Sequence, residues 1–382
     1  MPTPVRARVR LEIRLDAIRK NFLRIQRTVR PAAVMAVLKA DAYGLGAMPL
    51  ADMLVAAGVD RLGVAELKEA VALKKRFKVP VHILSGLLER EIPDCVKHGI
   101  ICPVSDEAIA VLLSKEAVKQ RKTVTIHIKV DTGMGRLGIP HAEAVAAVVR
   151  IAKLPGLKLE GICSHFANAN QPKHGKSREQ ISIFRAIVTD LEKKEIHFPL
   201  IHMANSDGIN NFPEATFNMV RTGINLYGVF DLQGIRAYNL VPSLTLKSTL
   251  LQRRLLPAGS TIGYGGTHVL FRDTWVGTIP AGYADGVPLA ASNSGRVLIR
   301  GKECPLIGRV SMDYITVDLS ACQAARVGDE VVLVGKSGTG RNAKEFTIED
   351  WAKIKQTHPY DIICSLGPRV ERVYIKGFLA AS

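Results

Sequence analysis

The sequence predicts an α/β protein: a (β/α)8 TIM barrel over residues 1–236, followed by a mainly β domain over residues 237–382. Two observations support this prediction. In the first part, eight short apolar segments alternate with stretches whose apolar residues recur at helical spacing. Eight such units in about 230 residues is the size of a closed parallel barrel. In the second part, short strand-like segments are separated by glycine-rich turns.

The barrel elements can be assigned in order along the chain. A helix over residues 15–29 precedes the first strand, because its apolar residues recur at helical spacing. The predicted strands are 34–38, 61–65, 81–85, 101–104, 123–130, 159–166, 199–204 and 219–226, and the helices include 51–57, 67–77, 106–118, 141–152 and 178–193. A doubly wound open sheet is the competing architecture, but the turn after the first strand lacks the Gly-x-Gly-x-x-Gly fingerprint of dinucleotide binding.

The β domain is predicted from short alternating or apolar runs. Its strands are expected at 244–251, 275–280, 296–300, 314–319 and 330–334, with one helix near 348–356. The first ten or so residues lead directly into an alternating run at 11–15, and we allow them to pack with the β domain instead of the barrel.

Composition narrows the class of protein. Hydrophobic residues make up 47% of 382, with no apolar run long enough to span a bilayer and no secretory signal, so we expect a soluble cytoplasmic protein that does not bind membranes. Six scattered cysteines form no ligand or disulfide pattern, which predicts no metal site. The net charge of +17 raises the question of nucleic acid, but aromatic residues are only 5% and no binding motif accompanies the basic clusters. We therefore expect no nucleic-acid partner.

One lysine stands at the end of the first barrel strand. Lys39 follows the apolar run 34–38 and precedes small and glycine residues. Apolar walls at a strand end disfavour an ammonium, so this amine could act as a nucleophile or base near neutrality. An arbitrary lysine in such a place more often extends to water, so the rest of the chain has to supply the other parts of a site.

Other strand ends carry polar residues that would converge on the same barrel mouth. Glycine-rich turns follow the fifth strand and would bring Arg136 inward, although a surface arginine is an equally good interpretation. His165 could lie against a ring or be an ordinary core histidine. Ser206 could bind phosphate or cap a helix. Arg221 in a buried strand needs an acceptor, and Gly223 leaves backbone N–H groups open to a phosphate.

The β domain contains turn segments of the same kind. Tyr264 lies between glycines, and similar segments occur at 282–286 and 308–313. A tyrosine flanked by glycines is usually only a turn residue, so none of these segments is specific by itself.

Together, these segments resemble the alanine racemases. The resemblance rests on Lys-Ala-Asp-Ala-Tyr-Gly-Leu-Gly at 39–46, and on the segments 131–138, 164–167, 204–206, 221–228, 264–265, 282–286 and 308–313, which occur in the family's order and approximate spacing. It covers the whole chain and implies a barrel that binds pyridoxal 5′-phosphate, a C-terminal β domain, and a head-to-tail homodimer whose active sites are shared between subunits.

The resemblance also implies roles for individual residues. Lys39 would hold the cofactor as a Schiff base and act as one acid/base, and Tyr264 of the partner subunit would be the opposite one. Arg221 would pair with the pyridine nitrogen. The remaining cofactor-binding positions would be Tyr43, His165, Asn205, Ser206, Gly223, Ile224 and Tyr360. Arg136 and Met312 would bind the substrate carboxylate, with Tyr283 and Asp313 at the entrance, and Lys129 matches a position that is carbamylated in some members.

The implied function is interconversion of L- and D-alanine, which would supply D-alanine for peptidoglycan. Three positions depart from the family's usual pattern: Thr222 where proline is common, residues 207–208 after Asn205-Ser206, and residues 168–170. They put affinity and substrate preference in question, so a serine or broad-specificity racemase remains an alternative. The related decarboxylases place a glutamate opposite the pyridine nitrogen where this chain has Arg221, and non-catalytic cofactor carriers of this type end after the barrel.

Overall fold

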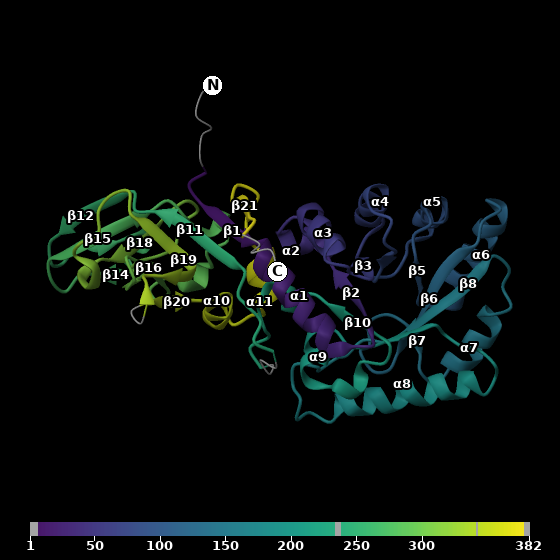
Figure 1. The fold of residues 1–382 in the computed structure, drawn as a ribbon. Coiled ribbons are helices and arrows are strands. Elements are labelled where there is room, and N and C mark those ends of the chain that lie inside the picture. The colour runs from purple at the N-terminus through teal and green to yellow at the C-terminus, as the bar shows by residue number, and fades with distance from the viewer. Residues whose placement is uncertain (1–6, 234–237, 341–342, 378–382) are drawn as a thin grey trace, which may run out of the picture. The chain divides into compact units, whose positions relative to one another are not determined.

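The computed structural model describes residues 7–233, 238–340 and 343–377. Contacts divide these residues into two compact units (Figure 1). One comprises Arg19–Leu226 and the described part of Gln233–Leu240, and the other comprises the described residues up to Ile18, Tyr227–Leu232 and those from Val241 onward. The predicted boundary between residues 236 and 237 lies outside the described residues.

The first unit is built around eight parallel strands. They are hydrogen-bonded in the order β4-β3-β2-β10-β9-β8-β6-β5, and a parallel bridge between His82 and Ile101 brings the two ends together. The strands are β2 (Ala33–Val37), β3 (Arg61–Val64), β4 (Val81–Ile83), β5 (Cys102–Val104), β6 (Val124–Asp131), β8 (Leu157–Cys163), β9 (Leu200–His202) and β10 (Met219–Thr222). The predicted barrel is confirmed, and each of its eight strands overlaps one of the eight predicted segments.

Helices alternate with these strands along the chain (Figure 1). They are α1 (Leu15–Val29), α2 (Lys39–Gly44), α3 (Ala47–Ala56), α4 (Leu67–Arg76), α5 (Ile92–His98), α6 (Glu107–Lys119), α7 (Ala144–Ile151), α8 (Lys176–Glu192) and α9 (Ser206–Asn211). A short strand β7 (Ile139–Pro140) pairs with β6. Helix α6 begins where Asp106 accepts a hydrogen bond from the Ile109 N–H, as expected of an N-cap aspartate.

The barrel interior carries polar side chains because β6 alternates in polarity. Val124, Ile126, Ile128 and Val130 are buried and apolar, whereas His127 and Lys129, on the opposite face of the strand, are buried and polar. His127 forms hydrogen bonds with side chains of β8 and β9, which places this polar face inside the barrel. Most TIM barrels fill this space with branched apolar residues, so the polar interior calls for a chemical explanation.

The second unit is mainly β, as predicted. Its largest sheet has the order β17-β16-β19-β11-β1-β21, with β20 on β19; β12-β15-β18 and β13-β14 form two smaller sheets. The strands are β1 (Arg10–Arg14), β11 (Leu244–Thr249), β12 (Gln252–Leu256), β13 (Thr261–Ile262), β14 (His268–Val269), β15 (Thr274–Ile279), β16 (Arg296–Ile299), β17 (Lys302–Pro305), β18 (Ile315–Asp318), β19 (Glu330–Ser337), β20 (Lys344–Phe346) and β21 (Glu371–Ile375).

Helices α10 (Ile348–Lys355) and α11 (Pro359–Cys364) belong to this unit. Trp351 of α10 is fully buried, and its indole N–H donates to the Leu333 carbonyl oxygen at 2.8 Å, which satisfies the polar atom of a large core side chain. At the N-terminal end of the chain, Leu11 and Ile13 of β1 are buried while their neighbours are not. This alternation directs one face of β1 to the core of the largest sheet, where β1 pairs with β11 and β21.

Candidate active site

Lys39 begins a turn of unusual handedness directly after β2. Residues 40–43 all have positive φ angles between 52° and 63°, so α2 is a left-handed turn made of non-glycine residues. The left-handed helix costs roughly 1–2 kcal/mol per residue. Such strain is found where a structure over-determines it, and it is concentrated at functional sites.

The contacts of Asp41 and Glu69 hold this turn in place. The Asp41 N–H donates to Glu69 Oε1 at 3.1 Å, and Asp41 Oδ1 accepts from the Ala47 N–H at 2.7 Å. Glu69 also accepts from the Ala65 and Glu66 N–H groups at the start of α4. The first and second βα units are thereby linked at the point where Lys39 leaves the strand, and Lys39 itself is exposed.

A group of cationic side chains lies around His165, just beyond β8. Burial, followed by the positive charges of Arg221, Arg136, Lys129 and Lys39, lowers the pKa of His165 well below its ordinary value. Burial also lowers the pKa of Lys129, with further contributions from Arg221, Arg136 and Lys39. Its ammonium donates to the Leu84 carbonyl oxygen at 2.8 Å. Segments from well-separated parts of the chain, around residues 39, 129–136 and 221, thus supply one electropositive site, suited to an anion.

The loop that carries Arg136 is organised by Asp131 at the end of β6. Its carboxylate accepts backbone hydrogen bonds from Gly133, Met134 and Gly135 at 2.8–2.9 Å. Burial opposes ionisation, but the N–H groups of Gly133, Gly135, Met134 and Arg136 outweigh it and lower the pKa of Asp131. The side chain of Arg136 is exposed.

Predicted phosphate-binding residues from three strand ends lie together, with Tyr43 after β2, Asn205 and Ser206 after β9, and Gly223 after β10. Ser206 Oγ accepts from the Gly223 N–H at 2.9 Å, and Asn205, rather than Ser206, caps α9 by accepting from the Gly208 N–H. A Cβ atom at Gly223 would lie 2.3 Å from the Tyr43 hydroxyl, so only glycine fits there. Thr222 Oγ1 is buried with no hydrogen-bond partner in the described part of the chain.

Arg221 is held from four directions. Its Nη1 lies 2.7 Å from His202 Nδ1, and its Nη2 lies 2.9–3.0 Å from the Ser164 and Met203 carbonyl oxygens and from His165 Nδ1. No carboxylate pairs directly with Arg221 among the residues described here. Burial lowers the pKa of this guanidinium, which nevertheless remains cationic.

The hydrogen-bonded network below Arg221 continues down the barrel. His202 Nε2 lies 2.8 Å from His127 Nδ1, and His127 Nε2 lies 3.1 Å from Glu160 Oε2. Glu160 in turn receives Arg61 Nη1 at 2.7 Å. Sequence reasoning assigned no role to these four residues. The signal that could have found them is the alternation of polar residues at 127 and 129 in a strand buried on both faces.

Two residues of this network, together with His82, could supply ligand atoms to a metal ion. A ring nitrogen of His82, a ring nitrogen of His127 and a carboxylate oxygen of Glu160 are all within 4.8 Å of one another. The Arg61 guanidinium, however, contacts both Glu160 and His82 Nε2. A cation there would have to displace a permanently charged arginine.

In the β domain, the predicted loops gather in one place. A Cβ at Gly263 would lie 3.2 Å from the Arg309 backbone nitrogen, so the Tyr264 turn lies beside segment 308–313. The Tyr283 N–H donates to the Ser311 carbonyl oxygen at 3.0 Å, which joins segment 282–286 to the same group. The side chains of Tyr264, Tyr283 and Met312 are 73%, 46% and 52% exposed. Three tyrosine and methionine side chains therefore project from joined loops.

An arginine that sequence reasoning missed fixes these loops. Arg369 donates to both carboxylate oxygens of Asp285, to Asp313 Oδ1 at 2.7 Å, and to the Met312 carbonyl oxygen at 3.3 Å. Two carboxylates on one exposed guanidinium raise the pKa of Arg369 further. Tyr360 lies in α11 of this unit.

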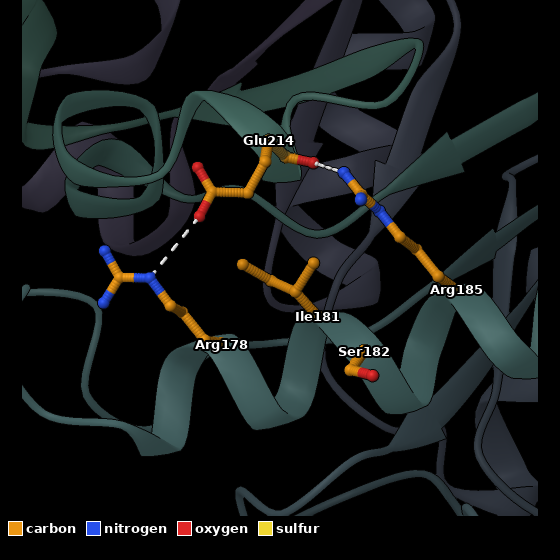
Figure 2. A pocket seen from close by; sticks show the side chains of 5 residues that line it. All are labelled: Arg178, Ile181, Ser182, Arg185 and Glu214. Carbon is orange, nitrogen blue, oxygen red and sulfur yellow. Dashed lines mark hydrogen bonds and ion pairs between the residues drawn. The ribbon is translucent and has the colours of Figure 1, made fainter.

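The barrel unit also has a cavity of about 270 Å³ (Figure 2). It is lined by residues of α8 together with Glu214, none of which is a predicted site residue. Figure 2 shows the Glu214 carboxylate directed at Arg178, 3.9 Å away, and its carbonyl oxygen at Arg185. Both arginines are thus already engaged, so we do not regard this cavity as a reaction site.

Comparison with known proteins identifies the family. The model of the alanine racemase N-terminal domain matches residues 13–231, and that of the C-terminal domain matches residues 243–374. The chain belongs to the alanine racemase family. Alanine racemase of Thermodesulfovibrio yellowstonii is 40% identical over 369 residues (95% of this chain, 97% of that protein), and alanine racemase of Halothermothrix orenii is 38% identical over 366 residues (95% and 96%).

Solved alanine racemase structures share the fold of both units. The enzyme from Streptomyces lavendulae aligns with a TM-score of 0.90 at 35% identity, covering 98% of each chain. The Bartonella henselae alanine racemase, whose structure has covalently bound pyridoxal phosphate, aligns with a TM-score of 0.88 at 30% identity, covering 97% of this chain and all of that one. Across the described residues, no helix combines the length and apolar character needed to cross a bilayer.

Proposed function

We propose that this member of the alanine racemase family binds pyridoxal 5′-phosphate and interconverts L- and D-alanine. The observation that carries the proposal is the group of Lys39, Lys129, Arg136 and Arg221 around His165 at the ends of the barrel strands. In the cell, such a reaction would supply D-alanine for peptidoglycan, and we infer a cytoplasmic enzyme.

The residues present fit this cofactor. A ring with a phosphate and a phenolic oxygen is anionic, and the cationic group offers it favourable charge. The absence of a side chain at Gly223 brings its backbone close to the hydroxyl groups of Tyr43 and Ser206, and the buried Thr222 hydroxyl lacks a partner among the residues described. We infer that Tyr43, Asn205, Ser206, Gly223, Ile224 and Tyr360 would hold the phosphate end and that His165 would lie against the ring.

When bound, the cofactor supplies an aldehyde for an amino group and a ring that acidifies the α-proton of an amino acid. Lys39 would hold the cofactor through that aldehyde. During turnover, its amine would exchange the α-proton on one face of the substrate, and the Tyr264 phenol would exchange it on the other. Racemisation requires loss of the proton from one face and its return to the other, which two opposed groups accomplish without moving.

Arg221 would donate to the ring nitrogen. Because a guanidinium keeps its protons, that nitrogen would stay unprotonated and the ring would be a weaker electron acceptor than one paired with a carboxylic acid. An arginine at this position would therefore favour proton exchange at the α-carbon over reactions in which the ring must accept more negative charge. It distinguishes the proposed racemase from a decarboxylase.

The substrate carboxylate would be bound by Arg136 and by the backbone of Met312, with Tyr283 and Asp313 at the entrance. Arg369 would set the position of the last two loops, because it binds Asp313, Asp285 and the Met312 carbonyl oxygen together.

The reaction is tested by following both α-deuteration and chirality in deuterated water. The purified, cofactor-loaded protein is incubated with a panel of L-amino acids. We expect alanine to exchange and racemise ahead of the others. Comparable turnover of serine and larger residues would make it a broad-specificity racemase, and absence of exchange for every amino acid would refute the proposal.

We further propose a homodimer whose active sites each combine Lys39 of one subunit with Tyr264 of the other. Mixing inactive Lys39→Ala with inactive Tyr264→Phe protein under subunit exchange tests this arrangement. Half of the dimers would be mixed, and half of their sites intact, so activity should return to about a quarter of wild type. Sites formed within one subunit would recover no activity on mixing.

Lys129 carries the features needed for carbamylation. The neutral amine is the form that adds CO2, and burial together with nearby cations lowers the pKa of Lys129. The product would place a carboxylate beside Arg136 and Arg221. We expect ¹³C-bicarbonate to give a carbamate NMR signal in the wild type that is absent from Lys129→Ala; a signal equal in both proteins would exclude Lys129.

A further inference from the structure

The polar network in the barrel has a defined hydrogen-bond direction because its two ends are chemically fixed. Arg221 Nη1 can only donate, so His202 Nδ1, at 2.7 Å, must accept. Glu160 receives Arg61 at 2.7 Å and is ionised, so its Oε2 must accept from His127 Nε2 at 3.1 Å. The remaining contact joins His127 Nδ1 to His202 Nε2 at 2.8 Å.

Only one arrangement of protons satisfies all three contacts. His127 carries its proton on Nε2 and accepts at Nδ1, and His202 carries its proton on Nε2 and accepts at Nδ1. Both rings are then neutral. Burial lowers the pKa of each, with Arg221 adding to the effect at His202, so neutrality is favoured at physiological pH.

The backbone of β8 is adapted to this network. The β6–β8 register changes where Ile126 faces Leu159 but His127 faces Gly161, so Glu160 is the extra residue of a β-bulge. Bulges redirect a side chain. A Cβ at Gly161 would lie 2.4 Å from His127 ring atoms, so the glycine makes room for the imidazole. Two adjacent residues thus place the carboxylate and the ring against each other.

We propose that Glu160 is a positioning residue for Arg221, acting through the ordered pair His127 and His202. The Glu160 carboxylate fixes the proton of His127 on Nε2. His127 then accepts at Nδ1, which fixes the proton of His202 on Nε2. His202 Nδ1 is therefore free of a proton and accepts from the Arg221 guanidinium. Without that anchor, His127 can carry its proton on Nδ1. His202 would then have to accept at Nε2 and turn an N–H toward Arg221, which donates as well. This inference rests on the proposed function only where Arg221 meets the cofactor.

A competing occupant of the same place is a divalent cation bound by His82, His127 and Glu160. Binding would require a lone pair on the His127 nitrogen nearest Glu160, which is the nitrogen that carries the proton in our assignment. The two arrangements therefore predict different protonation of one atom. Arg61, which donates to both Glu160 and His82, favours the ordered hydrogen bonds.

The test is ¹⁵N NMR of histidine-labelled holoenzyme, with each ring assigned by substitution. In the wild type, we expect neutral rings protonated at Nε2 for both His127 and His202. Glu160→Gln should keep this pattern, because Arg61 turns the amide oxygen toward the shared position, whereas Glu160→Leu should lose it. In the wild type, an Nδ1-protonated or charged ring at neutral pH, or a zinc-induced change at His127 Nε2, would overturn the proposal.

The effect on the site is measured separately. Glu160→Leu should shift the visible spectrum of the bound cofactor and lower kcat by about tenfold, as outer-shell partners commonly do, with little change in KM. Glu160→Gln should restore most of both. A Glu160→Leu protein whose spectrum and kcat match wild type refutes the positioning role. The wild-type NMR measurement needs no substrate, so it tests the proton arrangement of His127 and His202 even if the racemase activity is absent.

Discussion

Single residues carry most of the chemistry proposed here, and Tyr264 is the one that the sequence and the structure present most differently. In the sequence, it is an ordinary glycine-flanked turn residue. In the structure, Gly263 and Gly265 adopt φ angles of 71° and 73°, and the Tyr264 side chain between them is 73% exposed. An exposed phenol on a turn is suited to the proposed role of Tyr264, which is to complete the active site of the partner subunit.

Replacing Tyr264 with phenylalanine removes only the proposed proton carrier. We expect racemisation to fall by roughly 10²–10⁴-fold, the usual contribution of one acid/base group, while Lys39 still binds the cofactor. Chiral chromatography measures the loss of racemisation, and the visible absorbance of the cofactor measures whether it is still bound. Tyr238→Phe, which removes a hydroxyl bonded to the Ile209 carbonyl oxygen, is the control. Full activity of Tyr264→Phe would remove the assignment.

Gly161 tests the packing of the polar network. Its replacement by alanine puts a methyl group 2.4 Å from the His127 ring, and overpacking of this kind costs about 1–3 kcal/mol of unfolding free energy. Gly175→Ala is the matched control, because no atom lies within 4 Å of a Cβ built there and its φ is −61°. Equal stability of the two variants in urea unfolding would contradict the tight contact.

At the scale of elements, the sequence predicted the barrel strands because parallel strands buried on both faces form continuous apolar runs. It could not predict the handedness of residues 40–43. In Ala-Asp-Ala-Tyr only the aspartate tolerates positive φ more readily than an average residue, and the turn depends on tertiary contacts such as that of Glu69 with the Asp41 N–H. Likewise, Glu160 gave no signal, because a bulge in β8 and a partner 33 residues away in β6 decide its direction.

The left-handed turn predicts opposite effects for two alanine-to-glycine changes. At Ala40 (φ 52°), glycine relieves a strain of roughly 1–2 kcal/mol and costs about 0.5–1 kcal/mol in unfolded-state entropy. The net expectation is stabilisation by up to about 1.5 kcal/mol. At Ala72, an exposed position inside the right-handed α4, the same change should destabilise by about 1 kcal/mol. Chemical unfolding of both variants measures the two changes in unfolding free energy. Destabilisation by Ala40→Gly would show that the turn is not strained.

At the scale of the whole molecule, the periodicity of apolar residues makes both units recognisable, but it does not mark the residues that we propose for the active site. The barrel offers the cationic group around His165, and the β domain offers exposed aromatic side chains on loops that Arg369 binds together. Arg369 binds two carboxylates of neighbouring loops, and Glu160 binds His127 and Arg61, so both residues position other side chains and no motif of reactive side chains could reveal them.

The buried histidines make stability of the barrel unit depend on pH. Burial lowers the pKa of His82, His127, His165 and His202 from the ordinary value of 6.5, so the folded protein keeps them neutral while an unfolded chain takes up protons. Stability is therefore fully present above about pH 6.5 and falls as the pH drops below it, by about 1.4 kcal/mol per pH unit for each such histidine.

Glu160 extends this dependence to lower pH. Its hydrogen bonds from His127, and then from Arg61, lower its pKa from 4.5 to about 2, so its contribution is lost as the pH falls from about 4.5 toward 2. Urea unfolding between about pH 7 and pH 5.5, at fixed protein concentration, isolates the histidine part. His82→Asn should make the slope shallower, by up to about 1.4 kcal/mol per pH unit at the acidic end of this range, whereas His197→Asn, at an exposed position, should leave it unchanged. Equal slopes in the wild type and His82→Asn would mean that His82 is not held neutral by the fold.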